Sequence, residues 1–143
     1  MTQRIAIALA LLTGLGMIFI GTRFLIAPEI AEAGFGIHFN EQGDYSFHYI
    51  KGTRDLFSGI IICLLIFTRQ TKALGLALLA GTIIPIADML LVLSKEYNGI
   101  AQAMPHITAI IICSVVGTIL LITQPSHKNE TTPDYQKNKA LLS

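Results

Sequence analysis

Three ionisable residues stand at the start of an otherwise apolar run. Lys51, Arg54 and Asp55 precede a segment that stays largely hydrophobic as far as Thr68. On a helix these three residues and Ser58 fall within one arc of about 100°. Because a charge facing lipid is costly, that arc is expected to point toward other helices. A carboxylate beside a guanidinium can act as a general base, and the two cations can hold an anion.

Three more candidate residues lie at a similar depth in other apolar runs. Arg23 is near the end of the first run, Asp88 near the end of the third, and His106 near the start of the fourth. Successive spans alternate in direction, so these residues and Asp55 lie within about two turns of the same membrane face. The pattern predicts a polar cavity open to, or just below, the extracytoplasmic side.

Pairing within this set follows from helix geometry. Neighbours on a helix diverge by about 100°, so Arg54 and Asp55 are not expected to pair with each other. Arg54 is expected to reach Asp88, and Asp55 to reach Lys51 or Arg23. Two interpretations stay open: a functional cavity, or snorkelling residues and ion pairs that only hold the helix ends together.

The composition indicates a membrane protein that positions these groups on helices. The chain has 143 residues, 52% of them hydrophobic and 13% charged, against about 25% charged in a soluble domain. A span needs about 20 apolar residues, and four runs qualify: roughly 5–26, 49–68, 73–93 and 103–122. We predict an all-α fold, a transmembrane four-helix bundle over residues 1–126, in the cell membrane as a multi-pass protein. Residues 127–143 are expected to be a flexible polar tail.

Charge near the span ends predicts the orientation. Lysine and arginine favour the cytoplasmic side. The side shared by the N-terminus, the second loop and the tail carries Arg4, Arg69, Lys72, Lys128, Lys137 and Lys139. Both termini are therefore expected to be cytoplasmic. A cleaved signal peptide is the alternative for the first run, since Arg4 precedes it and the stretch 31–33 resembles a cleavage site, but the run is long for a signal core.

Small residues and proline predict how the spans pack. Gly52 and Gly59 lie beside the charged arc, where a neighbouring backbone can approach closely. A stripe recurring every four residues predicts a tight seam on the third span: Ala73, Ala77, Gly81 and Pro85. Pro85 also removes a backbone hydrogen bond and predicts a kink. The long loop 28–49 is either a connector at the membrane interface or a lid over the cavity.

Two stretches resemble a known family. The motif FLIAPEIAEAGFGI followed by KGTRDLFSGI is similar to a family of small four-span membrane proteins recorded as a domain of unknown function and loosely similar to DoxX-like proteins. The specific part is a KGxRDxxxG core, covering residues 51–59. Beyond the second span the resemblance is carried only by the number of spans and the position of Asp88. It implies a four-helix bundle and no particular activity.

Two functions from different classes fit these residues. In the first, the cavity binds a small lipophilic or anionic molecule, as an accessory subunit or alone, with Arg23, Lys51 and Arg54 as ligand-binding residues. In the second, the protein is a membrane-embedded isomerase or hydrolase. Its candidate catalytic residues are Asp55, Asp88 and His106, with one Asp as general base and His106 or the other Asp as acid. Transport is less favoured, because the inner halves of the spans are almost wholly apolar.

Other sites and partners are not indicated. His38, His48 and His106 match no ligand spacing, so we expect no metal and no cofactor. Cys63 and Cys113 lie inside spans and are interpreted as buried thiols. The basic residues form no patch for nucleic acid. The expected partners are a membrane lipid or small lipophilic molecule, with a second copy of the chain or a partner membrane subunit left open.

Overall fold

Helices make up the regular structure of the chain. The computed structural model describes residues 2–37 and 43–123, and this part contains helices and no strand. The all-α prediction is confirmed. The tail from 127 to 143 and His38 lie outside the described residues. In chain order the helices are α1 (Thr2–Ile26), α2 (Pro28–Phe35), α3 (Ser46–Phe67), α4 (Thr71–Gly81), α5 (Ile83–Leu93) and α6 (Ile100–Ile122).

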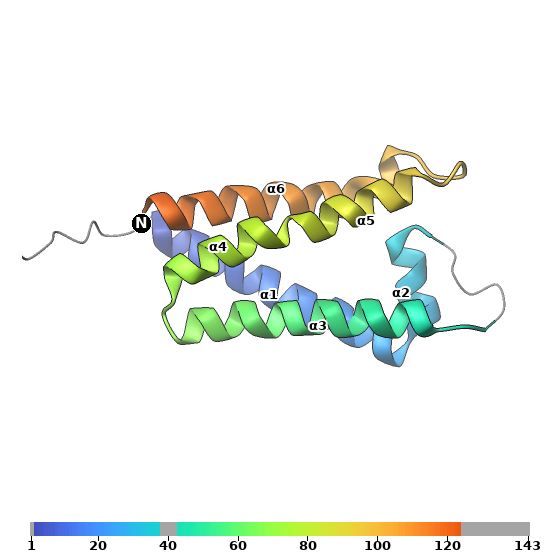
Figure 1. Ribbon diagram of the computed structural model, residues 1–143, viewed down its shortest axis with the longest axis horizontal. Helices are drawn as coiled ribbons and strands as arrows, with labels where there is room; N and C mark the ends of the chain where they lie inside the picture. Colours follow the sequence, from blue (N-terminus) through green and yellow to red (C-terminus); the bar gives the residue numbers. More distant parts are fainter. Residues whose placement is uncertain (1, 38–42, 124–143) are drawn as a thin grey trace, which may run out of the picture.

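The long helices run lengthwise, with α2 set across one end of the molecule (Figure 1). We call this the α2 end; the N-terminus lies at the opposite end. Each long helix begins a few residues before its predicted span. The described part has more helices than the four predicted, because the third span is divided and the first loop contains α2.

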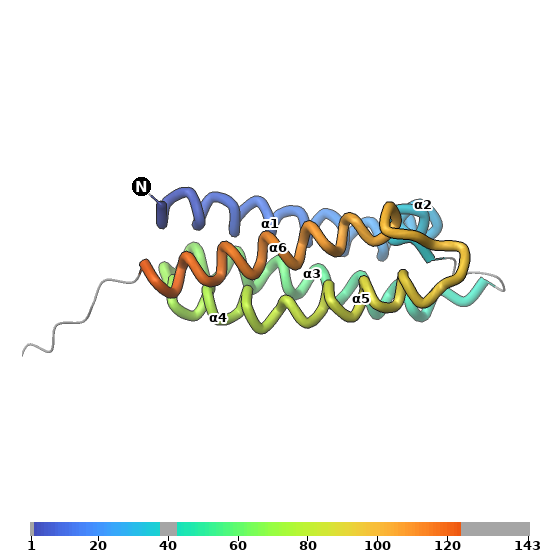
Figure 2. Tube along the Cα trace, turned by 90° about the horizontal axis from the view of Figure 1, so that it is seen from above, coloured from blue at the N-terminus to red at the C-terminus, as the bar shows by residue number. Residues whose placement is uncertain are grey.

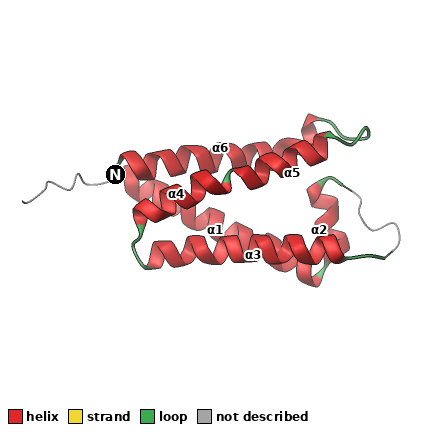
Figure 3. Ribbon diagram, in the orientation of Figure 1, coloured by secondary structure: helices red, strands yellow, loops and turns green. Residues whose placement is uncertain are grey.

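The division of the third span falls near Pro85. Proline cannot donate a hydrogen bond to the carbonyl of Gly81, and helix α4 ends at that residue (Figure 3). Thr82 keeps helical torsion angles and bridges the break. Its hydroxyl donates to the carbonyl oxygen of Leu78 at 3.0 Å. The hydrogen-bond pattern is interrupted where Pro85 was expected to disturb it, but α5 continues along nearly the same path as α4 (Figure 2), so the predicted kink is not a pronounced change of direction.

Within the part of the chain that the structure describes, three stretches are long and apolar enough to cross a membrane: Thr2–Ile26, Thr71–Leu93 and Ile100–Ile122. Helix α3 has 22 residues, enough length for a bilayer core. It is set apart by the three charged residues at its start, Lys51, Arg54 and Asp55.

The long helices associate as two pairs. Helix α1 packs mainly along α3, and α4 and α5 pack mainly along α6. Glycine makes the first pair close. A Cβ atom added to Gly59 would lie 2.5 Å from the carbonyl oxygen of Gly14, and one added to Gly52 would lie 2.9 Å from that of Gly21. The predicted close approach at Gly52 and Gly59 is confirmed.

The second pair uses a different seam from the one predicted. A Cβ atom on Gly75 or on Gly117 would lie 3.0 Å from the other residue's carbonyl oxygen. The predicted stripe is wrong as a tight seam: a Cβ atom on Gly81 would meet nothing within 4 Å, and Ala73 is exposed. Small residues either let helices touch or leave room between them, and their spacing alone does not distinguish the two outcomes.

Two apolar cores close the ends of the molecule. The core near the N-terminus joins α1, α3, α4 and α6 through Ala6, Ala10, Ile62, Leu74, Leu78, Val116 and Leu120. The core at the α2 end consists of Phe24, Ala31, Phe35, Ile37, Val92 and Ala103. Both cores draw residues from each helical pair, so they hold the pairs together at the two ends.

Helix α2 is fixed at both of its ends. Its C-cap, Gly36, has a φ of 91°, a left-handed conformation that glycine adopts without a steric cost. The Asn98 side-chain amide donates to the carbonyl oxygens of Gly36 at 2.6 Å and Val92 at 3.0 Å. Near the start of α2, the Tyr45 hydroxyl donates to a carboxylate oxygen of Glu29. The first loop is therefore tied to both the α3 and the α5–α6 sides of the molecule.

The glycine seam predicts a sharp contrast between two substitutions. Gly59→Ala places a methyl group against backbone of α1, so we expect a loss of about 1–3 kcal/mol in unfolding free energy. Gly16→Ala meets nothing within 4 Å and removes helix-interior glycine, so it should be neutral or stabilising by up to about 1 kcal/mol. Thermal unfolding in detergent micelles measures both. Equal effects of the two variants would contradict the seam.

Candidate functional site

Two cations and two carboxylates form one cluster between α3 and α5. The Lys51 ammonium lies 2.7 Å from Asp55 Oδ2 and 3.3 Å from Asp88 Oδ2. Arg54 donates from Nη2 to Asp88 Oδ2 at 2.9 Å and from Nη1 to Asp88 Oδ1 at 3.3 Å. Its Nε donates to Asp55 Oδ1 at 3.1 Å. We call these four residues the charge cluster.

The charge cluster is buried and electrically balanced. The exposed fractions are 2% for Asp55, 6% for Lys51 and 8% for Asp88, whereas the Arg54 side chain keeps 35%. All four carboxylate oxygens accept a hydrogen bond from a cation. Balance matters because an uncompensated buried charge costs several kcal/mol. The cluster therefore joins the two helical pairs through ionic hydrogen bonds.

Two aromatic rings complete the surroundings of Lys51. Its ammonium nitrogen lies 4.6 Å from the ring centroid of Phe35 and 5.1 Å from that of Phe24. Both distances are within the range of cation–π attraction. Lys51 is thus enclosed by two carboxylates and two rings.

The pairing differs in one respect from the sequence-based expectation. The contacts of Arg54 with Asp88 and of Asp55 with Lys51 are confirmed. The expectation that Arg54 and Asp55 do not pair is wrong. Although their Cα–Cβ bonds diverge, the long arginine side chain folds back so that Nε reaches the short neighbouring carboxylate while the two terminal nitrogens reach α5.

His106 lies beside the charge cluster and contacts it through Phe35. Its Nε2 is 3.4 Å from the carbonyl oxygen of Phe35. The two rings are edge to face with centroids 4.9 Å apart. Phe35 contacts Lys51 on one side and His106 on the other. His106 is 8% exposed.

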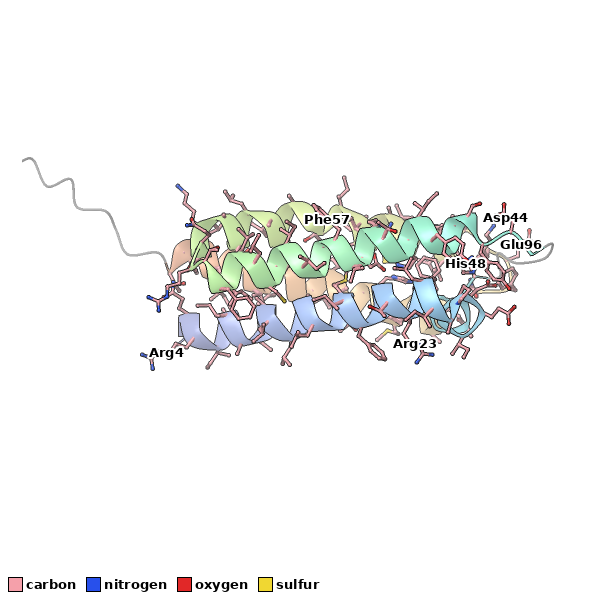
Figure 4. All side chains as sticks on the ribbon, turned by 90° about the horizontal axis from the view of Figure 1, so that it is seen from below. Arg4, Arg23, Asp44, His48, Phe57 and Glu96 are labelled. Atoms are coloured by element: carbon pink, nitrogen blue, oxygen red, sulfur yellow. The ribbon has the colours of Figure 1, made fainter. Side chains whose placement is uncertain are left out.

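Arg23 is less closely joined to the other candidates. Its guanidinium carbon lies 5.7 Å from the ring centroid of Phe19, one turn earlier on the same helix. Figure 4 shows its side chain at the outer edge of α1. Arg23 is thus at the rim of the site, whereas Lys51, Asp55 and Asp88 are inside it.

A cavity of about 440 Å³ lies between the two helical pairs. Its lining comes from all six helices, and most of the lining side chains are apolar. The ionisable lining residues are Arg23, Lys51, Asp55, Asp88 and His106, all toward the α2 end; deeper in, the wall includes Thr13, Ser58 and Cys113. The predicted polar cavity is instead an apolar cavity with one polar end.

The walls explain two features of the sequence. Ala77, Gly81 and Pro85 line the cavity, so the stripe of small residues on α4 and α5 provides the space. From Thr13 to Phe24 the lining on α1 spans twelve residues, a depth of about 16 Å. Helix α2 contributes Ala31 and Phe35 to the polar end, which fits the lid interpretation of the first loop.

Sequence reasoning missed a second buried polar pair. His48 Nε2 lies 2.6 Å from Glu32 Oε2, and both residues are buried. The pair joins α2 to α3 behind the charge cluster. The signal in the sequence was weak, because the two residues are 16 positions apart and each stands among loop-like neighbours. Phe24 and Phe35 were missed as well, since apolar residues in spans carry no mark of a site.

Taken together, the fold and the site define an all-α protein. Its described part has three helical stretches long and apolar enough to cross a membrane, and a buried charge cluster beside an apolar cavity. Comparison with protein families identifies the chain more closely. It belongs to the family described as Domain of unknown function (DUF4267), whose model matches residues 14–120. Neither a curated protein nor a solved structure matches the chain. The matched range contains the charge cluster and the whole cavity lining from Met17 onward.

The cluster predicts non-additive losses of stability. Asp88→Asn removes the charge that faces Arg54 and Lys51, so we expect a loss of about 2–3 kcal/mol. Combining it with Arg54→Gln should recover about 0.5–3 kcal/mol relative to the sum of the two single losses. Thermal unfolding in detergent gives both values. Glu96→Gln, an exposed acid at the same end, is the control and should change little. Additive losses would show that the two residues do not act as a pair.

Proposed function

We propose that this chain is a four-span protein of the cell membrane with both termini in the cytoplasm. Three helices have the length and apolarity of spans. Helix α3 is the fourth span in this proposal: it packs along α1, and Lys51 and Asp55 are turned away from the lipid into the molecule. The charges at the ends support the orientation. Arg4 lies at one end, and Asp44 and Glu96 lie at the α2 end (Figure 4).

Within that membrane arrangement, the cavity is a binding site for a small lipophilic molecule in the extracytoplasmic leaflet. The observation that carries this proposal is the combination of an apolar wall about 16 Å deep with a polar end held by the charge cluster. A volume of about 440 Å³ is within the usual range for ligand pockets, about 300–1,000 Å³. The protein acts in this proposal as a binding protein, alone or as an accessory subunit of a membrane complex.

The contacts favour a lipophilic ligand over an anionic one. Lys51 is enclosed by carboxylates and aromatic rings. Arg54 uses three nitrogens on Asp55 and Asp88 and is not part of the cavity wall. At the charge cluster, an anion would have to take a cation away from a buried carboxylate, which is unfavourable. Arg23 at the rim is the cation of the lining that would be left for an anion.

The second candidate function is a membrane-embedded isomerase or hydrolase. It is favoured by one observation: Asp55, Asp88 and His106 all line the same cavity. Against it stands the engagement of both carboxylates: every oxygen of Asp55 and Asp88 already accepts a hydrogen bond from Lys51 or Arg54, so a reacting group would have to displace one of these cations. His106 is the lining residue best placed to accept a proton in this candidate.

The proposed topology can be tested with single cysteines. In a background lacking Cys63 and Cys113, Gln70→Cys lies at the α3–α4 turn and Glu96→Cys at the α2 end. We expect a membrane-impermeant thiol reagent to label Glu96→Cys on intact cells and Gln70→Cys only after the membrane is opened. Labelling of Gln70→Cys from outside, with Glu96→Cys protected, would mean the reverse orientation.

The binding function can be tested by filling the cavity. Gly81→Leu adds a side chain to the cavity wall where space is open. We expect roughly ten-fold weaker labelling of the cavity by a photoreactive alkyl diazirine, equivalent to about 1.4 kcal/mol. The matched control is Gly16→Leu, also in open space but outside the cavity lining. Labelling sites are located by mass spectrometry of peptides. Equal labelling of both variants and the unchanged chain would contradict binding in the cavity.

A further inference from the structure

His106 has one ring nitrogen whose role is fixed by the backbone. Nε2 faces the carbonyl oxygen of Phe35 at 3.4 Å. A carbonyl oxygen accepts hydrogen bonds and does not donate them, so Nε2 carries the proton. In a neutral imidazole the other nitrogen, Nδ1, then holds a lone pair and is an acceptor.

Nδ1 is an acceptor in need of a donor. His106 is more than nine-tenths buried and lines the cavity. Within residues 2–37 and 43–123, no side chain or backbone group donates a hydrogen bond to Nδ1. A buried acceptor without a donor costs about 1–3 kcal/mol. The cavity therefore gains from a molecule that brings a donor to this point.

Apart from Arg23 at the rim, the charged and hydroxyl groups on the wall direct their donors to the protein itself. The Ser58 hydroxyl donates to the carbonyl oxygen of Arg54 at 2.8 Å, and the Thr13 hydroxyl donates to that of Leu9 at 2.9 Å. Lys51 donates to Asp55 and Asp88. What remains inside the rim for a ligand is acceptor capacity. The carboxylate oxygens of Asp55 and Asp88 already accept from cations, whereas Nδ1 of His106 accepts from no described group, and the two hydroxyls keep their oxygen lone pairs.

We propose that the cavity takes an uncharged lipophilic alcohol or phenol, and that its hydroxyl donates a hydrogen bond to Nδ1 of His106. The apolar body of the molecule then extends along the small residues of α4 and α5, toward Thr13. This inference rests on the proposed binding function and adds the chemical class of the ligand. It follows from the donors that the wall already uses inside the rim and from Nδ1 of His106, an acceptor at the polar end to which no described group donates a hydrogen bond.

The test uses three photoreactive alkyl probes of equal length that end in a hydroxyl, a methoxy or a carboxylate group. The full chain is placed in phosphatidylcholine nanodiscs, and half-saturation of cavity labelling is measured as a mole fraction of the lipid. We expect the hydroxyl probe to bind about five- to ten-fold more tightly than the methoxy probe, the effect of one buried hydrogen bond. The methoxy group keeps the oxygen and removes only the donor.

Two substitutions of His106 distinguish the roles of its two ring nitrogens in ligand binding. His106→Asn places an amide oxygen near Nδ1 and should retain part of the preference for the hydroxyl probe. His106→Gln places its amide near Nε2 and should reduce the preference to about two-fold or less, because it supplies no acceptor at Nδ1. Thermal unfolding checks that both variants are folded. If neither folds, the three probes on the unchanged chain decide the question alone.

The possible results distinguish a failure of this inference from a failure of the proposed binding function. In one result, the hydroxyl and methoxy probes bind equally, with labelling above that of the Gly81→Leu variant. That result would support the binding function but contradict the inference that the ligand is an alcohol or phenol. Tighter binding of the carboxylate probe would also overturn it, with Arg23 at the rim as the anchor. Labelling no greater than in Gly81→Leu for all three probes would remove the binding function itself.

Discussion

Four charges in an apolar interior set the conditions for everything else in this structure. Lys51, Arg54, Asp55 and Asp88 tolerate burial only while each carboxylate has its cation, so α3 and α5 must meet at one depth and one rotation. Neither helix touches the other extensively through apolar side chains; α3 packs on α1 and α5 on α6. The charge cluster thus fixes the depth and rotation at which the two helical pairs meet. The apolar cores at the ends also hold the pairs together, but apolar contacts do not require one particular register.

Glycine and small residues have opposite consequences in the two parts of this arrangement. In the α1–α3 pair, Gly14, Gly21, Gly52 and Gly59 bring the backbones together until no space remains. On α4, Ala77 and Gly81 face the other pair across a gap that no large side chain fills. The cavity exists because the helices are packed tightly within each pair and loosely between the pairs.

The sequence predicted the features that follow from local periodicity and from electrostatic necessity. The long helices, the interruption near Pro85, the approach at Gly52 and Gly59, and the contact of Arg54 with Asp88 were all accessible in this way. The sequence did not predict α2, the pair of Glu32 with His48, or the apolar character of the cavity. These depend on how residues far apart in the chain meet, and neither spacing nor hydropathy records that. The stripe from Ala73 to Pro85 was misinterpreted for the same reason, because the partner surface decides whether small residues make contact or space.

The position of the cavity between two closed ends determines the route by which a ligand can reach it. One core seals it toward the N-terminus, and the other, with α2, seals it toward the opposite end. Exposed aromatic residues of its lining, Phe19 on α1 and Phe57 on α3, instead stand at the sides of the molecule. In the membrane arrangement proposed above, a molecule that arrives through the sides comes from the surrounding bilayer and has already left water behind. Occupancy would then depend on how strongly that molecule partitions into lipid, so the membrane would serve as its reservoir and set the concentration that the protein experiences.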